Sequence, residues 1–405
     1  MSEIFIARQP IYDRQLTVYA YELLYRTGSD HNHAEVTDGD DATSQVLVNA
    51  LMEIGLPDLV GDSMAFINLT QQHILNGLPH SLAHSNIVLE VLEDVVPDAA
   101  LIDALQNLKK AGYSIALDDF IYDDSSHPLV ALADIIKVDV MALPGAALAD
   151  QIKQLRPMGV KLLAEKVETN EEFEYCKALG FHYFQGYFFC KPNIVKGKHT
   201  PTSRMAIMQL LTKVQDPNLD IGELQTLISR DVSLSYRILR YINSVHFNLG
   251  KKIESMHQAI NLLGLNTIKS WVTILAMSSI DDKPYELILT ALIRARMCES
   301  LAAKLGISPE HAFTAGLFST LDAFIDKPLD EILATLPLAD ELHTALLRHT
   351  GELGKLLDLV LNYERGLWQE IPGTQFDVKT LRTHYLDALR WAGALSDLLL
   401  NKQGA

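Results

Sequence analysis

The chain has 405 residues, enough for two or three domains that each bury a core of their own. Its 48% hydrophobic and 21% charged residues are typical of a globular protein and exclude a disordered chain. The net charge of −17 argues against a nucleic-acid partner, because binding a phosphate backbone requires clustered Lys and Arg. No apolar run approaches about 20 residues, so no membrane span is expected. Three scattered cysteines and the lack of a secretory pattern predict a cytoplasmic protein.

Short apolar runs alternate with segments of helical periodicity between Phe5 and about Lys191. Helical spacing appears, for example, over Val46 to Ile54 and over Leu101 to Leu108. The apolar runs are Val18 to Tyr25, Ala65 to Ile67, Ile87 to Leu89, Ile115 to Leu117, Ile135-Ile136, Leu162 to Ala164 and Tyr183-Phe184. This alternation predicts a mostly parallel sheet covered by helices, with closure into a (β/α) barrel as the leading option.

Six successive runs end in polar residues that can bind a metal ion or form hydrogen bonds. These residues are Asn68, Glu90, Asp118 with Asp119, Lys137 with Asp139, Glu165 and Gln185. Because the C-terminal ends of barrel strands converge on one face, we expect these side chains to form one site. Carboxylates and an amide without His or Cys suit hard cations such as Mg²⁺ or Mn²⁺. Taken alone, the aspartate pair is better explained as a strand end that begins a loop, and it is the recurrence of the pattern that favours a site.

The adjacent acids Asp118 and Asp119 could bridge two metal ions that activate water against a phosphodiester. Strand side chains alternate between faces, so both acids can point inward only if the strand turns at its end. Lys137 would offset charge on a phosphoryl oxygen, and Glu165 would position or deprotonate water.

The apolar run from Val18 to Tyr25 and Arg26 directly after it contribute three further candidate site residues, which lie two positions apart. Glu22, Leu24 and Arg26 share one face, which offers a carboxylate, an apolar contact and a guanidinium suited to phosphate. The alternative interpretation is an edge strand with a solvated Glu–Arg pair.

The segment Glu22-Leu23-Leu24-Tyr25-Arg26 resembles the E-A-L-x-R signature of EAL domains, which hydrolyse or bind the bacterial second messenger cyclic di-GMP. The resemblance covers about residues 3 to 195 and implies an EAL-type modified TIM barrel. Further motifs match in order: Gln9-Pro10-Ile11, Phe66-Ile67-Asn68-Leu69-Thr70, Leu89-Glu90-Val91, Ala116-Leu117-Asp118-Asp119-Phe120, Ile136-Lys137-Val138-Asp139, Ala164-Glu165-Lys166-Val167-Glu168 and Gln185-Gly186-Tyr187.

The resemblance also implies a role for each matching residue. The implied Mg²⁺ or Mn²⁺ ligands are Glu22, Asn68, Glu90, Asp118 and Asp119; the implied catalytic residues are Lys137 and Glu165; and the implied nucleotide-binding residues are Gln9, Leu24, Arg26, Asp139, Glu168 and Gln185. Arg26 would contact a phosphate, and Glu168 would anchor the loop after Phe120. A homodimer formed through the barrel is a further expectation for this family.

Several positions depart from the family pattern. Ile121 to Ser126 replaces a glycine-rich loop, which removes backbone freedom and adds Asp123 and Asp124 near an anionic substrate. Lys166 replaces a glycine and His182 an aspartate, while Leu23 replaces the signature alanine. The sequence therefore favours a degenerate domain that binds cyclic di-GMP, metal or both, with weak or no hydrolysis. The alternative is an active phosphodiesterase that produces the linear dinucleotide pGpG.

The composition changes beyond the barrel, and we expect domains at residues 1–195 and 204–405 joined by a linker at 196–203. Strand signals nearly vanish after the linker, and helical periodicity predicts an all-α domain. Tyr236 to Ser244 and Ile253 to Gly264 resemble the HDOD domain, a helical module similar to metal phosphohydrolases but without their metal site. The resemblance implies no catalysis here and a surface that binds an unknown protein partner.

Overall fold

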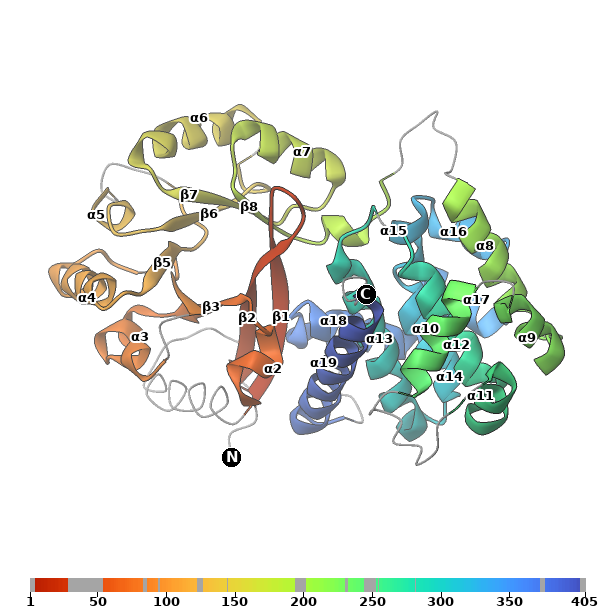
Figure 1. Cartoon of the computed structure of the whole chain (residues 1–405). Helices are drawn as coiled ribbons and strands as arrows, with labels where there is room; N and C mark the ends of the chain where they lie inside the picture. Colours follow the sequence, from red (N-terminus) through yellow and green to blue (C-terminus); the bar gives the residue numbers. More distant parts are fainter. Residues whose placement is uncertain are drawn as a thin grey trace. The chain divides into compact units, whose positions relative to one another are not determined.

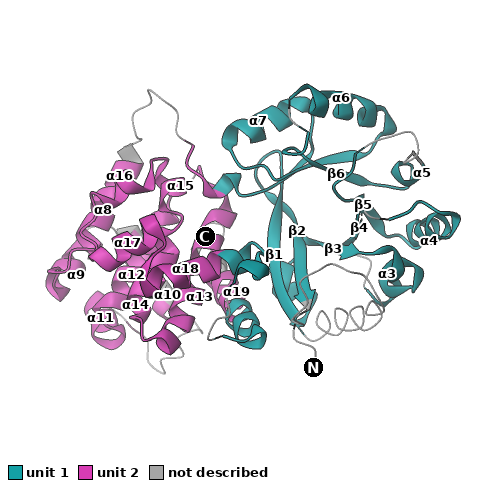
Figure 2. Ribbon diagram, turned by 180° about the vertical axis from the view of Figure 1, so that it is seen from behind, with its two compact units in different colours: residues 1–189, 362–386 teal, residues 190–361, 387–405 magenta. Residues whose placement is uncertain are grey.

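The computed structural model describes residues 4–27, 54–82, 86–93, 95–121, 127–143, 145–193, 202–229, 232–243, 253, 255–280, 282–371 and 376–400. It divides into two compact units, residues 1–189 with 362–386 and residues 190–361 with 387–405 (Figure 2). Most of the helix expected between Val46 and Ile54, residues 122–126 of the loop after the aspartate pair, and linker residues 196–201 lie outside the described residues.

The first unit contains eight strands that close into a barrel in chain order. The strands are β1 (Ile4–Asp13), β2 (Val18–Thr27), β3 (Met64–Leu69), β4 (Ile87–Val91), β5 (Ser114–Leu117), β6 (Ile135–Asp139), β7 (Lys161–Glu165) and β8 (Tyr183–Gln185). Strand β1 is antiparallel to both β2 and β8, whereas the other neighbouring strands are parallel. The predicted modified (β/α) barrel is therefore confirmed.

Strand β1 was missing from the predicted apolar runs. Its sequence contains Arg8, Gln9 and Pro10 between the apolar residues, and proline is depleted in strands because it cannot donate to the ladder. Pairing to β2 from Ile4 to Tyr12 holds it in place.

Helices follow the strands and cover the outside of the barrel (Figure 1). They are α2 (Leu56–Val60), α3 (Gln71–Leu75), α4 (Ala99–Lys110), α5 (His127–Val130), α6 (Ala146–Leu155) and α7 (Asn170–Leu179). In α4 the Asp98 side chain accepts from the Leu101 backbone N–H, which satisfies a donor at the helix start. Helix α7 begins with a capping box between Thr169 and Glu172. Local capping chemistry thus sets where these helices begin.

The barrel interior holds an apolar ring to which every strand contributes one side chain. The ring consists of Ile11, Ala20, Phe66, Val88, Ala116, Ile135, Leu163 and Tyr183, in the order β1 to β8. These side chains are buried at the centre of the barrel and form the base on which the next layer of side chains lies.

The described part of the second unit is helical, as predicted. Its helices are α8 (Thr202–Val214), α9 (Ile221–Ser229), α10 (Val232–Ile242), α11 (Met256–Leu263), α12 (Leu265–Met277), α13 (Tyr285–Ala302), α14 (Pro309–Phe318), α15 (Leu321–Ile325), α16 (Leu329–Leu333) and α17 (Asp340–Arg348). Two further helices, α18 (Gly351–Glu364) and α19 (Val378–Leu400), have residues in both units. Asn243 directly follows α10 and pairs through its side-chain amide with the backbone N–H and carbonyl of Ile253.

Across the described residues, no single helix has the length and apolar character needed to cross a membrane. Helices α11 and α12 meet those criteria only when taken together, and they are bent by 119°.

Candidate functional site

A polar layer lies directly above the apolar ring of the barrel. Side chains two positions apart on a strand share a face, so the residue two positions beyond each ring member also points into the barrel. In β2 to β8 that residue is, in turn, Glu22, Asn68, Glu90, Asp118, Lys137, Glu165 and Gln185. Strand β1 runs the opposite way, and there Gln9 lies two positions before Ile11. Eight of the predicted site residues therefore lie in a single layer.

Lys137 lies at the centre of this layer, with its side chain 1% exposed. Its Nζ atom is 2.8 Å from Glu165 Oε1, 2.9 Å from Asp118 Oδ1 and 3.3 Å from Glu22 Oε2. It also forms an ion pair with Glu90. Burial alone would lower the pKa of this ammonium, but the four surrounding carboxylates outweigh burial and raise the pKa. Lys137 is therefore charged and holds four acids together.

Amide side chains hold Glu22 in a fixed orientation. Asn68 Nδ2 donates to Glu22 Oε1 over 2.7 Å, and Gln185 Nε2 donates to Glu22 Oε2 over 2.6 Å. Gln185 Nε2 also donates to Gln9 Oε1 over 3.0 Å. The hydroxyl of Tyr25 donates to the backbone carbonyl of Asn68, which positions that strand end. No role was predicted for Tyr25, although it belongs to the segment that resembles E-A-L-x-R.

The chain turns between the two adjacent aspartates, as their convergence requires. The Asp118 N–H continues the sheet ladder by donating to the Val91 carbonyl over 2.9 Å. Asp119 then adopts a φ of 40°, and the next N–H, of Phe120, donates to the Lys137 carbonyl over 3.1 Å. Carboxylate oxygens of Asp118, Asp119 and Glu165 consequently lie within 4.8 Å of one another. This is close enough for one cation to contact all three.

Several buried oxygen atoms of the layer and of the adjacent Asp119 have no hydrogen-bond partner among the described residues. These atoms are Asn68 Oδ1, Glu90 Oε2, Asp119 Oδ1, Glu165 Oε2 and Gln185 Oε1. A buried acceptor without a partner is costly, at about 1–3 kcal/mol each. Burial and neighbouring acids raise the pKa of Glu90, and they raise that of Glu165 to about 8. Unpaired oxygens and excess negative charge in one layer fit hard divalent cations.

A second lysine, Lys166, contacts Asp119. Lys166 Nζ is 2.5 Å from Asp139 Oδ2 and 3.4 Å from Asp119 Oδ2. Lys166 has a φ of 56°, in the left-handed region that glycine favours, at a cost of about 1 kcal/mol or more for a residue with a Cβ. Asp139, predicted to bind nucleotide, here anchors Lys166. Lys166 was recognised from the sequence as a departure from the family pattern, but its contacts with Asp139 and Asp119 were not predicted.

Three predicted nucleotide-binding residues lie outside the central cluster. Leu24 packs against Gly366 in the C-terminal segment of this unit. The two residues are so close that a Cβ added to Gly366 would lie 2.9 Å from Leu24 Cδ1. Arg26 is exposed, and its Nη1 donates to Gln369 Oε1 over 3.5 Å. Glu168 is exposed, and most of the loop that it was predicted to anchor lies outside the described residues.

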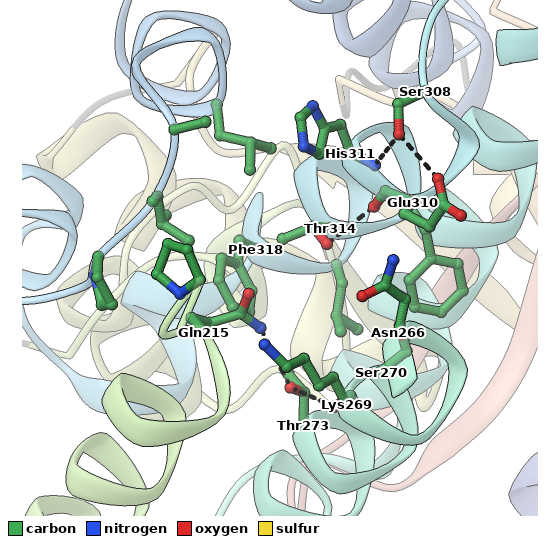
Figure 3. Close-up of a pocket in the computed structure, with 17 residues that line it drawn as sticks. Gln215, Asn266, Lys269, Ser270, Thr273, Ser308, Glu310, His311, Thr314 and Phe318 are labelled. Carbon is green, nitrogen blue, oxygen red and sulfur yellow. Dashed lines mark hydrogen bonds between the residues drawn. The ribbon is translucent and has the colours of Figure 1, made fainter. Parts of the chain in front are cut away.

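The helical unit has a separate pocket of about 320 Å³, bounded in part by α12 and α14 (Figure 3). Several of its polar groups contact neighbouring parts of the same unit. Ser308 accepts from the His311 N–H, Thr314 donates to the Glu310 carbonyl, and Lys269 donates to the Asp216 carbonyl. These contacts cap or brace helices, so they account for the Ser308, Thr314 and Lys269 side chains without a ligand.

Comparison with known proteins places both units in described families. The EAL domain model matches residues 57–192, and the HDOD domain model matches residues 200–326. The uncharacterized protein YuxH of Bacillus subtilis is 37% identical over 97% of this chain and 99% of its own length. The cyclic di-GMP phosphodiesterase CdgJ of Vibrio cholerae is 33% identical over 98% of this chain and 94% of its own length. The chain belongs to the family of proteins that join an EAL domain to an HDOD domain.

Among solved structures, a standalone EAL protein from Vibrio cholerae O395 in its c-di-GMP-bound form is similar to this chain. It has 23% sequence identity and a TM-score of 0.38, and the match covers 47% of this chain and 92% of that protein.

Proposed function

We propose that the barrel binds cyclic di-GMP together with a divalent cation, Mg²⁺ or Mn²⁺, and hydrolyses the nucleotide weakly or not at all. The observation that carries this proposal is the polar layer, in which buried oxygens lack partners and negative charge exceeds positive charge. Family membership supports it, because EAL domains use divalent metals and CdgJ is named as a cyclic di-GMP phosphodiesterase.

In this proposal the side chains of the layer divide into ligands and supporting groups. The metal ligands are Glu22, Asn68, Glu90, Asp118 and Asp119. A bound divalent ion would activate water and polarise a phosphodiester oxygen. Lys137 keeps the ligand carboxylates together, and Glu165, with a pKa of about 8, can hold or accept a proton near neutral pH.

The nucleotide would bind beside this layer, contacted by Gln9, Gln185, Leu24 and Arg26. Gln9 and Gln185 already form a hydrogen-bonded pair that faces Glu22. Arg26 is exposed and can reach a phosphate as a bidentate donor. Asp139 and Glu168 would act from the ends of β6 and β7, Asp139 through Lys166.

Weak hydrolysis is favoured by two features near Asp119. Lys166 contacts Asp119, so one carboxylate of the proposed metal site already faces an ammonium. In addition, the segment Ile121 to Ser126 contains no glycine, and a loop there has less backbone freedom than the glycine-rich loop of active relatives.

A second candidate is an active phosphodiesterase that opens cyclic di-GMP to linear pGpG. The convergence of Asp118, Asp119 and Glu165 favours it, as does the similarity to CdgJ, which is named as a cyclic di-GMP phosphodiesterase. In both candidates the HDOD domain serves as the surface that binds a protein partner, and the barrel can form the interface of a homodimer.

The deciding experiment uses the purified full chain with cyclic di-GMP and either Mn²⁺ or Mg²⁺. Nucleotide binding is measured by calorimetry in the presence of Ca²⁺, and the linear product is measured by chromatography after addition of Mn²⁺. Glu22→Gln keeps the shape of the side chain but removes a charge from the layer. Glu171→Gln, at an exposed position in α7, is the matched control.

We expect binding in the micromolar range, little or no product, and at least a tenfold loss of affinity in Glu22→Gln but not in Glu171→Gln. Rapid turnover that Glu22→Gln abolishes would replace this proposal with the active enzyme. If the nucleotide does not bind at all, both candidates are wrong and the chain acts as a scaffold.

A further inference from the structure

Lys166 occupies a position where the backbone conformation favours glycine. Its φ is 56°, and it directly follows Glu165 at the end of β7. A residue with a Cβ is strained there, and the contacts of the surrounding structure have to hold it in this conformation. The contacts are two carboxylates, Asp139 and Asp119.

The Lys166 ammonium is held in place from one side. Asp139 Oδ2 lies 2.5 Å from Lys166 Nζ, while Asp139 Oδ1 accepts from the N–H groups of Met141 and Ala142 over 2.7 and 3.1 Å. Asp139 is thus fixed at the start of a turn, and its ion pair keeps the ammonium near Asp119 Oδ2.

Asp119 is one of the three acids that could share a cation. Lys137 contacts the other two, Asp118 and Glu165, whereas Lys166 contacts Asp119. Each acid of this trio therefore already faces an ammonium. A divalent ion bound to all three would be repelled by both lysines, whereas an ion bound to Glu22, Glu90 and Asp118 would be repelled by Lys137 alone.

We propose that Lys166 is a built-in cation that takes the electrostatic place of a second divalent ion beside Asp119. The chain then binds a second divalent ion at the trio more weakly than a first ion held through Glu22, Asn68, Glu90 and Asp118. This inference rests on the proposed metal site, and it gives a physical reason for weak turnover if hydrolysis requires two ions.

The test measures metal binding by the full chain without nucleotide. Free Mn²⁺ is followed by electron paramagnetic resonance during titration, and equilibrium dialysis confirms the number of bound ions. Lys166→Gln removes the charge, and Lys166→Arg keeps it. Lys109→Gln removes a lysine that pairs with Asp134 over 2.6 Å at another place on the barrel, and it serves as the matched control.

We expect the second Mn²⁺ to bind the unaltered chain at least tenfold more weakly than the first. Lys166→Gln should strengthen the second site at least tenfold and change the first by less than threefold. Lys166→Arg and Lys109→Gln should behave as the unaltered chain does.

Equal binding of two ions by the unaltered chain and by Lys166→Gln would overturn the role of Lys166 but leave the proposed metal site intact. Failure of every variant to bind Mn²⁺ would overturn the metal site itself. Calorimetry with cyclic di-GMP is run separately on the same variants. A Lys166→Gln chain that loses affinity for the nucleotide, with unchanged Mn²⁺ binding, would show that Lys166 contacts the nucleotide and would likewise overturn the proposal.

Discussion

Lys137 is the buried ammonium around which Glu22, Glu90, Asp118 and Glu165 gather. Removing one partner of a buried ion cluster leaves charge without compensation, which typically costs about 3–5 kcal/mol. We therefore expect Lys137→Met to lower the free energy of unfolding by about this amount at pH 8 in the presence of a chelator. Urea denaturation measures the change.

The control for this prediction is Lys109→Met. Lys109 and Asp134 are 32% and 40% exposed, and an ion pair so accessible to solvent contributes at most about 1 kcal/mol. Millimolar Mn²⁺ should restore more stability to Lys137→Met than to Lys109→Met, because only the first leaves unbalanced acids in the proposed metal site. Similar losses in the two variants, unaffected by Mn²⁺, would contradict this account of the layer.

The end of β8 depends on one glycine. Gly186 has a φ of 146°, and a Cβ placed on it would lie 2.0 Å from the Val167 carbonyl oxygen. The two segments are also joined by the hydrogen bond from the Val167 N–H to the Gln185 carbonyl, over 3.0 Å. Gly186→Ala must push apart the segments that follow β7 and β8, and we expect it to lower the free energy of unfolding by about 3 kcal/mol.

Gly159→Ala is the matched control. Gly159 also has a positive φ, of 74°, but a Cβ there would meet no atom within 4 Å. Only backbone strain remains, at about 1 kcal/mol. Thermal unfolding of both variants, followed by circular dichroism, separates the two effects. Equal losses would mean that the close approach of Val167 does not constrain the end of β8.

At the level of strands, periodicity made most of the polar layer predictable. A residue that ends an apolar run and lies two positions beyond a core residue must share its face, which is why Asn68, Glu90 and Glu165 could be placed from sequence. Gln9 could not be placed in this way, because β1 runs antiparallel and was not among the predicted strands. Lys166 could not be assigned its contacts, since they depend on a φ that lysine seldom adopts.

The barrel unit also includes residues 362–386, which no local sequence pattern could assign to it. The Tyr363 hydroxyl donates to the Ile6 carbonyl over 3.0 Å, across a separation of 357 residues. Trp368 stacks on Phe5 with a centroid distance of 5.4 Å, and the Tyr385 hydroxyl accepts from the Arg8 N–H over 3.3 Å. The C-terminal segment thus packs against β1. A domain that ends at residue 195, as the sequence predicts, would lack these contacts.

If these contacts hold β1 in the barrel, weakening them should loosen this strand first. Tyr363 is fully buried, and Tyr363→Ala removes a large ring and a hydrogen bond, at an expected cost of about 3–5 kcal/mol. We measure hydrogen exchange by mass spectrometry in the variant and in the unaltered chain. The substitution should increase the exchange rate in β1 more than in β4 and β5, which lie elsewhere in the barrel. Tyr236→Ala, at a side chain that is 64% exposed, should leave exchange in β1 unchanged. Uniform acceleration across all strands would mean instead that the barrel opens as one cooperative unit and that β1 depends no more on the C-terminal segment than the other strands do.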